Sequence, residues 1–283
     1  MFELKIENKN GILLNLTQNE SNYQVVGIEG LQPPAATINL SKNANMDGST
    51  FNSSYLNERN IVLTVKLRGE VEKNRLKLYE FLGTGDYCKI FYSNGSRQVY
   101  CEGHAESIEN DMFSESQEVQ ISIICENPYL YALNLIYMDI SKDFNVFEFP
   151  FSIEESGAEL SSLELNRRAS VLNLGEAPTG IEMTLHSTMH VKNPIIYNES
   201  TGDFLKINTD LKVGEIIIIN TNKGKKYIKK YVDGVEYNIL NTLVGGSTWH
   251  QLKVGANAFV YTADENESTL FIEFTYGTLY KGV

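Results

Sequence analysis

Two histidines, His186 and His190, are four positions apart, which is the spacing of two zinc ligands on one face of a helix. The residues around them alternate instead, because Ile181, Met183 and Leu185 fall on odd positions, as they do on a β-strand. Four residues of strand extend about 13 Å, and one metal ion cannot bridge that distance. The pattern therefore favours surface or inter-strand histidines over a metal site.

The single tryptophan, Trp249, is followed directly by His250. Such a pair is found in sugar-stacking platforms, beside catalytic histidines and in plain hydrophobic cores. Leu252 and Val254 do not keep one strict period with the tryptophan, and a tight turn follows at Gly255. We predict that the indole covers one end of a core and donates its N–H to a backbone carbonyl.

Motifs that indicate catalysis or phosphate binding are not found in the sequence. It contains no Gly-x-Ser-x-Gly elbow, no Gly-x-Gly-x-x-Gly and no P-loop. The adjacent carboxylates Glu154 and Glu155, and likewise Asp264 and Glu265, fall in turn regions, where solvated charge is expected. The sequence therefore predicts no enzyme, no catalytic or metal-binding residue and no cofactor.

The charge balance limits the classes of partner. The chain has 24 Lys and Arg against 36 Asp and Glu, a formal net charge of −12. A negative surface repels phosphate backbones, so sequence-specific nucleic-acid binding is disfavoured. No apolar run approaches the ~18 residues that span a membrane, and the first residues lack an export-signal pattern, so we expect a soluble protein. The three cysteines, Cys88, Cys101 and Cys125, stand among apolar residues and are expected to be buried and reduced.

Short apolar runs bounded by Gly, Asn, Asp and Pro dominate the chain and are typical of an all-β sandwich or barrel. The segment VEKNRLKLYEFLG instead places Val71, Leu78 and Leu82 on one helical face, and it predicts a single helix that ends at Gly83. In the first half, the expected strands cover residues 2–6, 11–16, 23–28, 61–67, 88–92, 98–108 and 117–125.

A second series of strands begins with FNVFEFPF, residues 144–151, so we place a domain boundary near residue 140. The expected domains are residues 1–140 and 141–283. Within the second, three strands form a meander, and the Asp233-Gly234 pair between the last two suits a type I′ hairpin. These strands are expected at residues 214–221, 225–232 and 235–241.

A long polar loop is predicted at residues 41–59, with Phe51 and Tyr55 as its only large aromatic side chains. A loop of this length in a compact domain is usually functional or disordered. The two aromatic residues either fold back on their own sandwich or anchor on a neighbour, and we favour the second. We therefore predict that the loop is mobile in the free subunit and becomes ordered on a neighbouring molecule.

The sequence KGKKYIKK, residues 223–230, is the one basic cluster in this acidic chain. It includes Lys225, Lys226, Lys229 and Lys230. These lysines either contact an acidic partner or an anionic wall polymer, or they protect an edge strand from aggregation, and the last interpretation is favoured. Together with Phe51 and Tyr55, they are the candidate residues for a protein interface.

Several short motifs follow one another in a recognisable order. In the first half they are VGIEGLQPP, RNIVLTVKLRG, the helical segment and CENPYLYA. In the second half they are NP followed by STGDFLKIN, GSTW followed by LKVGAN, and a closing YKGV. Their order resembles the distal tail protein family of long-tailed bacteriophages, over almost the whole chain.

This resemblance implies a mainly β fold with two sandwich-type domains, an N-terminal ring-forming domain that carries the helix and a C-terminal galectin-like sandwich. It also implies a homo-hexameric ring at the virion tail tip, assembled in the cytoplasm of the host bacterium. Such a ring joins the tail tube protein to the tail-associated hub or lysin protein and holds receptor-binding proteins. The alternative is a carbohydrate-binding adhesion module for host cell-wall glycans, although the His-x-Asn-Pro-Arg and Trp-Gly-x-Glu-x-Arg motifs of galectins are missing.

Overall fold

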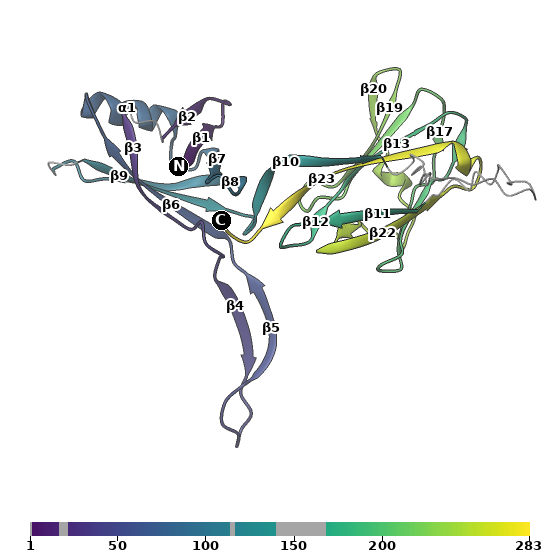
Figure 1. Ribbon diagram of the computed structural model, residues 1–283, viewed down its shortest axis with the longest axis horizontal. Coiled ribbons are helices and arrows are strands. Elements are labelled where there is room, and N and C mark those ends of the chain that lie inside the picture. Colours follow the sequence, from purple (N-terminus) through teal and green to yellow (C-terminus); the bar gives the residue numbers. More distant parts are fainter. Residues whose placement is uncertain (1, 17–21, 114–116, 140–167) are drawn as a thin grey trace, which may run out of the picture. The chain divides into compact units, whose positions relative to one another are not determined.

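The structure is a computed structural model that describes residues 2–16, 22–113, 117–139 and 168–283 (Figure 1). Contacts within the chain define two compact units, Met1–Asn134 with Leu279–Val283, and Leu135–Thr278. The strand expected at residues 144–151 and the pair Glu154 and Glu155 lie outside the described residues.

The first unit is built on one antiparallel sheet with the strand order β2-β1-β7-β8-β9-β6-β3. Strand β10 pairs with β8 through its first residues and then runs into the second unit. The strands predicted in this half are all present. Their bounds are β1 (Glu3–Asn8), β2 (Leu13–Asn15), β3 (Tyr23–Glu29), β6 (Arg59–Leu67), β7 (Tyr87–Ser93), β8 (Gln98–Asn110), β9 (Glu118–Cys125) and β10 (Leu130–Asp139).

The core of the first unit follows from the alternation along its strands. On β6, Ile61, Leu63 and Val65 point inward and are fully buried, while the residues between them are partly exposed. Helix α1 (Val71–Phe81) adds Leu78 to the same core, which confirms the predicted helix. The helix ends at Phe81, two residues before the expected glycine, because Leu82 is extended and enters the core from outside the helix.

The three cysteines lie in this core as free thiols. Burial raises the pKa of the Cys88 thiol to about 12, so this group stays protonated at neutral pH. The expectation of buried, reduced thiols is therefore confirmed.

The prediction of a long loop at residues 41–59 is wrong. Strand β4 (Ala36–Ser41) turns back into β5 (Thr50–Leu56), and Arg59 already begins β6, so only the turn at residues 42–49 and the two residues 57–58 are irregular. The two strands are hard to recognise in the sequence because they carry many polar side chains. In the structure these side chains form hydrogen bonds with one another across the hairpin. Asn39 Nδ2 donates to Ser53 Oγ at 2.9 Å, and Asn52 Nδ2 donates to Ser41 Oγ at 2.5 Å.

The second unit is a sandwich of two sheets, β23-β13-β18-β19-β20 and β11-β22-β15-β16. Phe259 of one sheet meets Phe274 of the other edge to face, with ring centroids 5.0 Å apart. Two short pairs, β12-β21 and β14-β17, complete it. The bounds are β11 (Arg168–Asn173), β12 (Thr179–Gly180), β13 (Glu182–Ser187), β14 (Val191–Lys192), β15 (Ile195–Asn198), β16 (Asp203–Lys206), β17 (Asp210–Leu211), β18 (Ile216–Asn220), β19 (Tyr227–Val232), β20 (Val235–Asn238), β21 (Gln251–Leu252), β22 (Gly255–Thr262) and β23 (Leu270–Tyr280).

Strands β18, β19 and β20 form the predicted meander, each a few residues shorter than expected. Asp233 and Gly234 have φ of 51° and 79°, the two positive values that a type I′ turn requires. The mainly β fold predicted from the sequence is thus confirmed, with α1 as the one α-helix of the described residues. Within the same residues, no helix is both long and apolar enough to cross a lipid bilayer.

Candidate protein interface

The hairpin of β4 and β5, residues 36–56, is here called the arm. Across the described residues its strands pair only with each other, and Figure 1 shows the hairpin extending away from the sheet of its own unit. Large apolar side chains on it are exposed to an unusual degree, Ile38 by 59%, Leu40 by 56% and Phe51 by 61%. Isolated apolar side chains on a surface are common, but a group of them on one projecting element marks a contact surface.

The register of the arm separates an apolar face from a polar one. Asn52 is an extra residue in β5, so Leu40 lies opposite Phe51, while Ile38 lies opposite Ser54. Directly opposed residues share a face, and therefore Ile38, Leu40 and Phe51 lie on one side of the arm. Tyr55, which is 58% exposed, lies on the other side with the Asn39–Ser53 pair. The structure thus places both predicted anchors on the arm, but on opposite faces.

The basic cluster is distributed over a turn and a strand. Lys229 forms an ion pair with Glu236 at 2.8 Å, and Lys230 forms one with Glu215 at 2.7 Å, so each is matched by a carboxylate of its own unit. Lys226 lies over the Trp249 ring, 5.5 Å from its centroid. Lys225 is exposed in the turn before β19. The role of these lysines in an interface stays a prediction.

Trp249 and His250 belong to the core of the second unit. The indole is partly buried against that core, as predicted, but among the described residues its N–H donates to no backbone carbonyl. His250 is 1% exposed, and its Nε2 lies 3.0 Å from the Ile196 carbonyl oxygen. Its ring contacts Phe259 edge-on at 5.6 Å. Of the three interpretations of this pair, the core interpretation is the one that the structure confirms.

The burial of His250 predicts a pH-dependent stability. Burial lowers the pKa of His250 below its ordinary value of 6.5, and the bond to Ile196 offsets only part of this effect. Below pH 6.5 this histidine therefore binds a proton in the unfolded chain, whereas in the folded chain it stays neutral to a lower pH. We expect the free energy of unfolding of the second unit to be largest above this pH and to fall as the pH drops toward the folded-state pKa.

Thermal unfolding between pH 7 and pH 5 measures this effect. For a unit of this size, a change of 1 kcal/mol in the free energy of unfolding shifts the melting temperature by about 2–4 °C. His250→Gln keeps an N–H donor for Ile196 but does not titrate, so its profile should be flatter in this range. A His250→Gln profile as steep as that of the wild type would contradict the assignment.

The other two histidines of this region are not brought together on a metal. His186 stacks on Phe271 with centroids 5.2 Å apart, and His190 Nε2 lies 3.2 Å from Asp210 Oδ1. Among the residues that the structure describes, no three His, Cys, Asp or Glu side chains gather as metal ligands.

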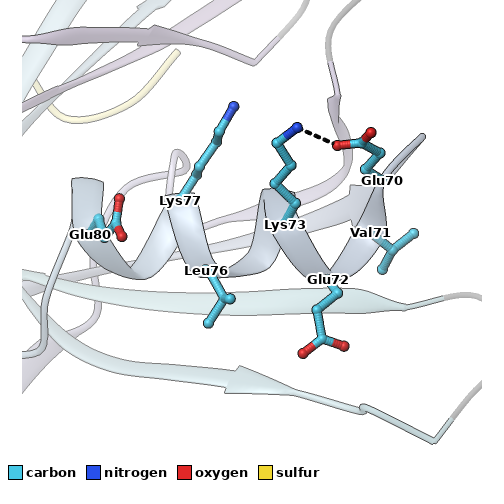
Figure 2. A pocket seen from close by; sticks show the side chains of 7 residues that line it. All are labelled: Glu70, Val71, Glu72, Lys73, Leu76, Lys77 and Glu80. Carbon is cyan, nitrogen blue, oxygen red and sulfur yellow. Dashed lines mark ion pairs between the residues drawn. The ribbon is translucent and has the colours of Figure 1, made fainter.

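A shallow groove lies along the outer side of α1 (Figure 2). Its charges have both signs, with Lys73 and Glu70 paired at 2.6 Å, and Leu76, which is 51% exposed, points away from this pair. An open surface of mixed charge on a single helix lacks the enclosed, converging polar groups of a catalytic site, and it suits contact with another protein. The lining residues are Glu70, Val71, Glu72, Lys73, Leu76, Lys77 and Glu80.

Comparison with protein families identifies both halves of the chain. Residues 10–125 match the family described as "Phage tail protein RIFT-related domain", and residues 174–277 match "Siphovirus-type tail component, C-terminal domain". No curated protein is significantly similar in sequence. The two matches define the protein as a structural component of a phage tail.

Solved structures share the fold over nearly the full length. The Dit protein (gp 19.1) of phage SPP1, described as a paradigm of the hub adsorption apparatus in phages that infect Gram-positive bacteria, matches with a TM-score of 0.72 and 16% identity over 99% of both chains. The baseplate of phage P2 in its activated conformation with Ca matches with a TM-score of 0.56 and 12% identity over 97% of this chain and 98% of that one. The chain belongs to the distal tail protein family of long-tailed phages.

Proposed function

We propose that this chain forms a homo-hexameric ring at the tip of the phage tail. In this proposal the ring joins the tail tube protein to the tail-associated hub or lysin protein, and its second unit, a galectin-like sandwich, anchors receptor-binding proteins. The ring assembles in the host cytoplasm and acts through its surfaces, without a reaction of its own. The match to a protein described as part of a hub adsorption apparatus supports this role, and so does the match to a baseplate.

The arm is the observation that carries the proposal. A two-stranded hairpin with no further partner is only marginally stable in water, so its apolar face gains from a second surface. Burying a side chain of the size of Phe51 contributes about 1.5–3 kcal/mol. In a cyclic ring each copy contacts the next through two different surfaces, so that every arm is covered once the ring closes. Each arm therefore lies on the neighbouring copy, with Ile38, Leu40 and Phe51 facing it.

Hydrogen exchange of the arm tests this proposal. Residues 36–56 should exchange quickly in the dissociated chain and become protected in assembled tails, because the arm is covered only there. Strands β6 and β9 are internal controls, since their protection comes from the core of their own unit. Equally strong protection of the arm in the free chain and in the tail would exclude a role in assembly.

The carbohydrate-binding alternative is tested by a glycan screen with cell-wall fragments. Tyr197, which is 39% exposed, lines a shallow depression with Glu199 and Asp203 and is the aromatic side chain of this depression that could stack on a sugar ring. The ring proposal predicts no specific glycan binding and no effect of Tyr197→Ala on assembly. Specific binding that Tyr197→Ala removes, by a chain that stays monomeric, would favour the alternative.

A further inference from the structure

One arginine at the root of the arm is buried and bonded to four backbone carbonyls. Arg59, the first residue of β6, is 1% exposed. Its Nε donates to Pro128 O at 2.9 Å, and its Nη2 donates to Lys281 O at 2.6 Å. Its Nη1 donates to Gln32 O at 2.9 Å and to Gly30 O. This group of five residues is here called the Arg59 junction.

The guanidinium is balanced by carbonyl dipoles rather than by a carboxylate. Among the described residues Arg59 forms no ion pair, although a buried charge is normally matched by one of opposite sign. Burial lowers its pKa, which reflects the cost of removing the charge from water. The planar fork of arginine can serve several acceptors at once, and a lysine ammonium cannot reach the same set.

The four carbonyls come from segments that are distant in sequence. Gly30 and Gln32 lead from β3 into the arm, and Arg59 itself follows the arm directly, so the junction holds both ends of the hairpin. Pro128 lies in the turn before β10, and Lys281 follows β23. These are the two strands that run from one unit into the other. The junction thus connects the arm root to both strands within the first unit.

Close packing around the junction leaves it little freedom. Gly30 has φ of +86°, and a Cβ at this position would lie 1.9 Å from Asn60 O. A Cβ on Gly282 would lie 2.9 Å from Pro33 Cδ, and the Val283 N–H donates to Leu31 O at 3.2 Å. The segment after β23 therefore packs directly against the chain that enters the arm.

We infer that Arg59 is the positioning residue of the arm, which fixes the direction in which the hairpin leaves its unit before any partner binds. This inference rests on the proposed function, because direction matters only if the arm has to meet a neighbour. A root held in one direction reduces the conformational entropy lost when the ring closes. The tip remains free to adapt, since none of the bonds of the junction involves residues 36–56 of the arm itself.

Hydrogen exchange on the full chain in its dissociated form tests the inference with Arg59→Met, Arg59→Lys and a matched control, Arg97→Met. Arg97 also binds the end of β23 and the segment after it, through the Tyr280 ring at 4.3 Å and Gly282 O, but it is not one of the five residues of the Arg59 junction. We expect exchange at residues 56–60, where the Asn57 N–H donates to Ala35 O, to become at least tenfold faster in both Arg59 variants. The control should change residues 280–283, and residues 56–60 should exchange as in the wild type.

Residues 61–67 of β6 and the whole of β9 provide the reference in every variant. Arg59→Lys keeps the charge and is the variant to interpret if Arg59→Met fails to fold. Root exchange equal to that of the wild type in Arg59→Lys would overturn the inference, and so would an equal loss of protection over the root and both core strands. These readouts need no ring, so failure of the wild-type chain to form a ring would contradict the proposed function alone.

Discussion

Replacing Ile38 and Phe51 by aspartate is expected to abolish ring assembly while the subunit stays folded. Both side chains are more than half exposed, and neither belongs to a core, so the substitution should change the free energy of unfolding by no more than about 0.5 kcal/mol. In a ring the same positions are covered, and an unpaired buried charge costs about 3 kcal/mol or more. Two such charges at every contact should weaken association by at least about a hundredfold.

Sedimentation velocity measures the loss of the ring, and thermal unfolding shows whether the subunit is intact. The matched control is Asn39→Asp with Asn52→Asp, which adds the same charge to the polar face of the same arm. Both side chains contact a serine hydroxyl that can donate to the new carboxylate, so the hairpin keeps its cross-strand bonds. If the ring still forms with the Ile38 and Phe51 substitutions, the apolar face of the arm is not part of the interface. The same conclusion follows if the control substitutions also abolish the ring.

Gly30→Ala is expected to destabilise the first unit by about 3 kcal/mol. A left-handed conformation costs an alanine roughly 1–2 kcal/mol, and displacing the backbone at Asn60 O adds strain of about the same size. Gly30 O also accepts a bond from Arg59, so the movement disturbs the junction. The loss is a large share of a typical stability of about 5–15 kcal/mol.

Urea unfolding followed by circular dichroism measures the effect of Gly30→Ala. Gly11→Ala is the matched control, because Gly11 also has a positive φ, +75°, but a Cβ added there would meet no atom of the described residues within 4 Å. It should lose only the conformational cost, roughly 1–2 kcal/mol. Equal losses in the free energy of unfolding at the two positions would show that the contact between the new Cβ and Asn60 O does not destabilise the protein.

Alternation along the strands made most of the fold predictable from the sequence. Where one face of a strand is buried, as on β6, apolar residues recur at every second position, and Leu78 reveals the helix in the same way. The arm lacks this signal because neither of its faces meets a core of its own unit. Its serines and asparagines look like a loop in sequence, although they form the cross-strand bonds of a hairpin.

The role of Arg59 could not be predicted from its position in the sequence. A charged residue at the start of a strand usually points to solvent, and its acceptors here are backbone carbonyls as far away in sequence as Lys281. One signal was present in the order of the motifs. VGIEGLQPP, RNIVLTVKLRG, CENPYLYA and YKGV supply all five residues of the Arg59 junction, so these widely separated motifs meet at one point of the fold.

The central claim is that the chain works as a closed ring of six copies. The most direct test is the mass of the purified full-length chain by light scattering, combined with class averages from electron microscopy. We expect a particle of six times the chain mass of 31.9 kDa with six-fold symmetry, in equilibrium with free subunits. A chain that stays monomeric at every concentration, and that also enters mature tails as a single copy, would contradict it.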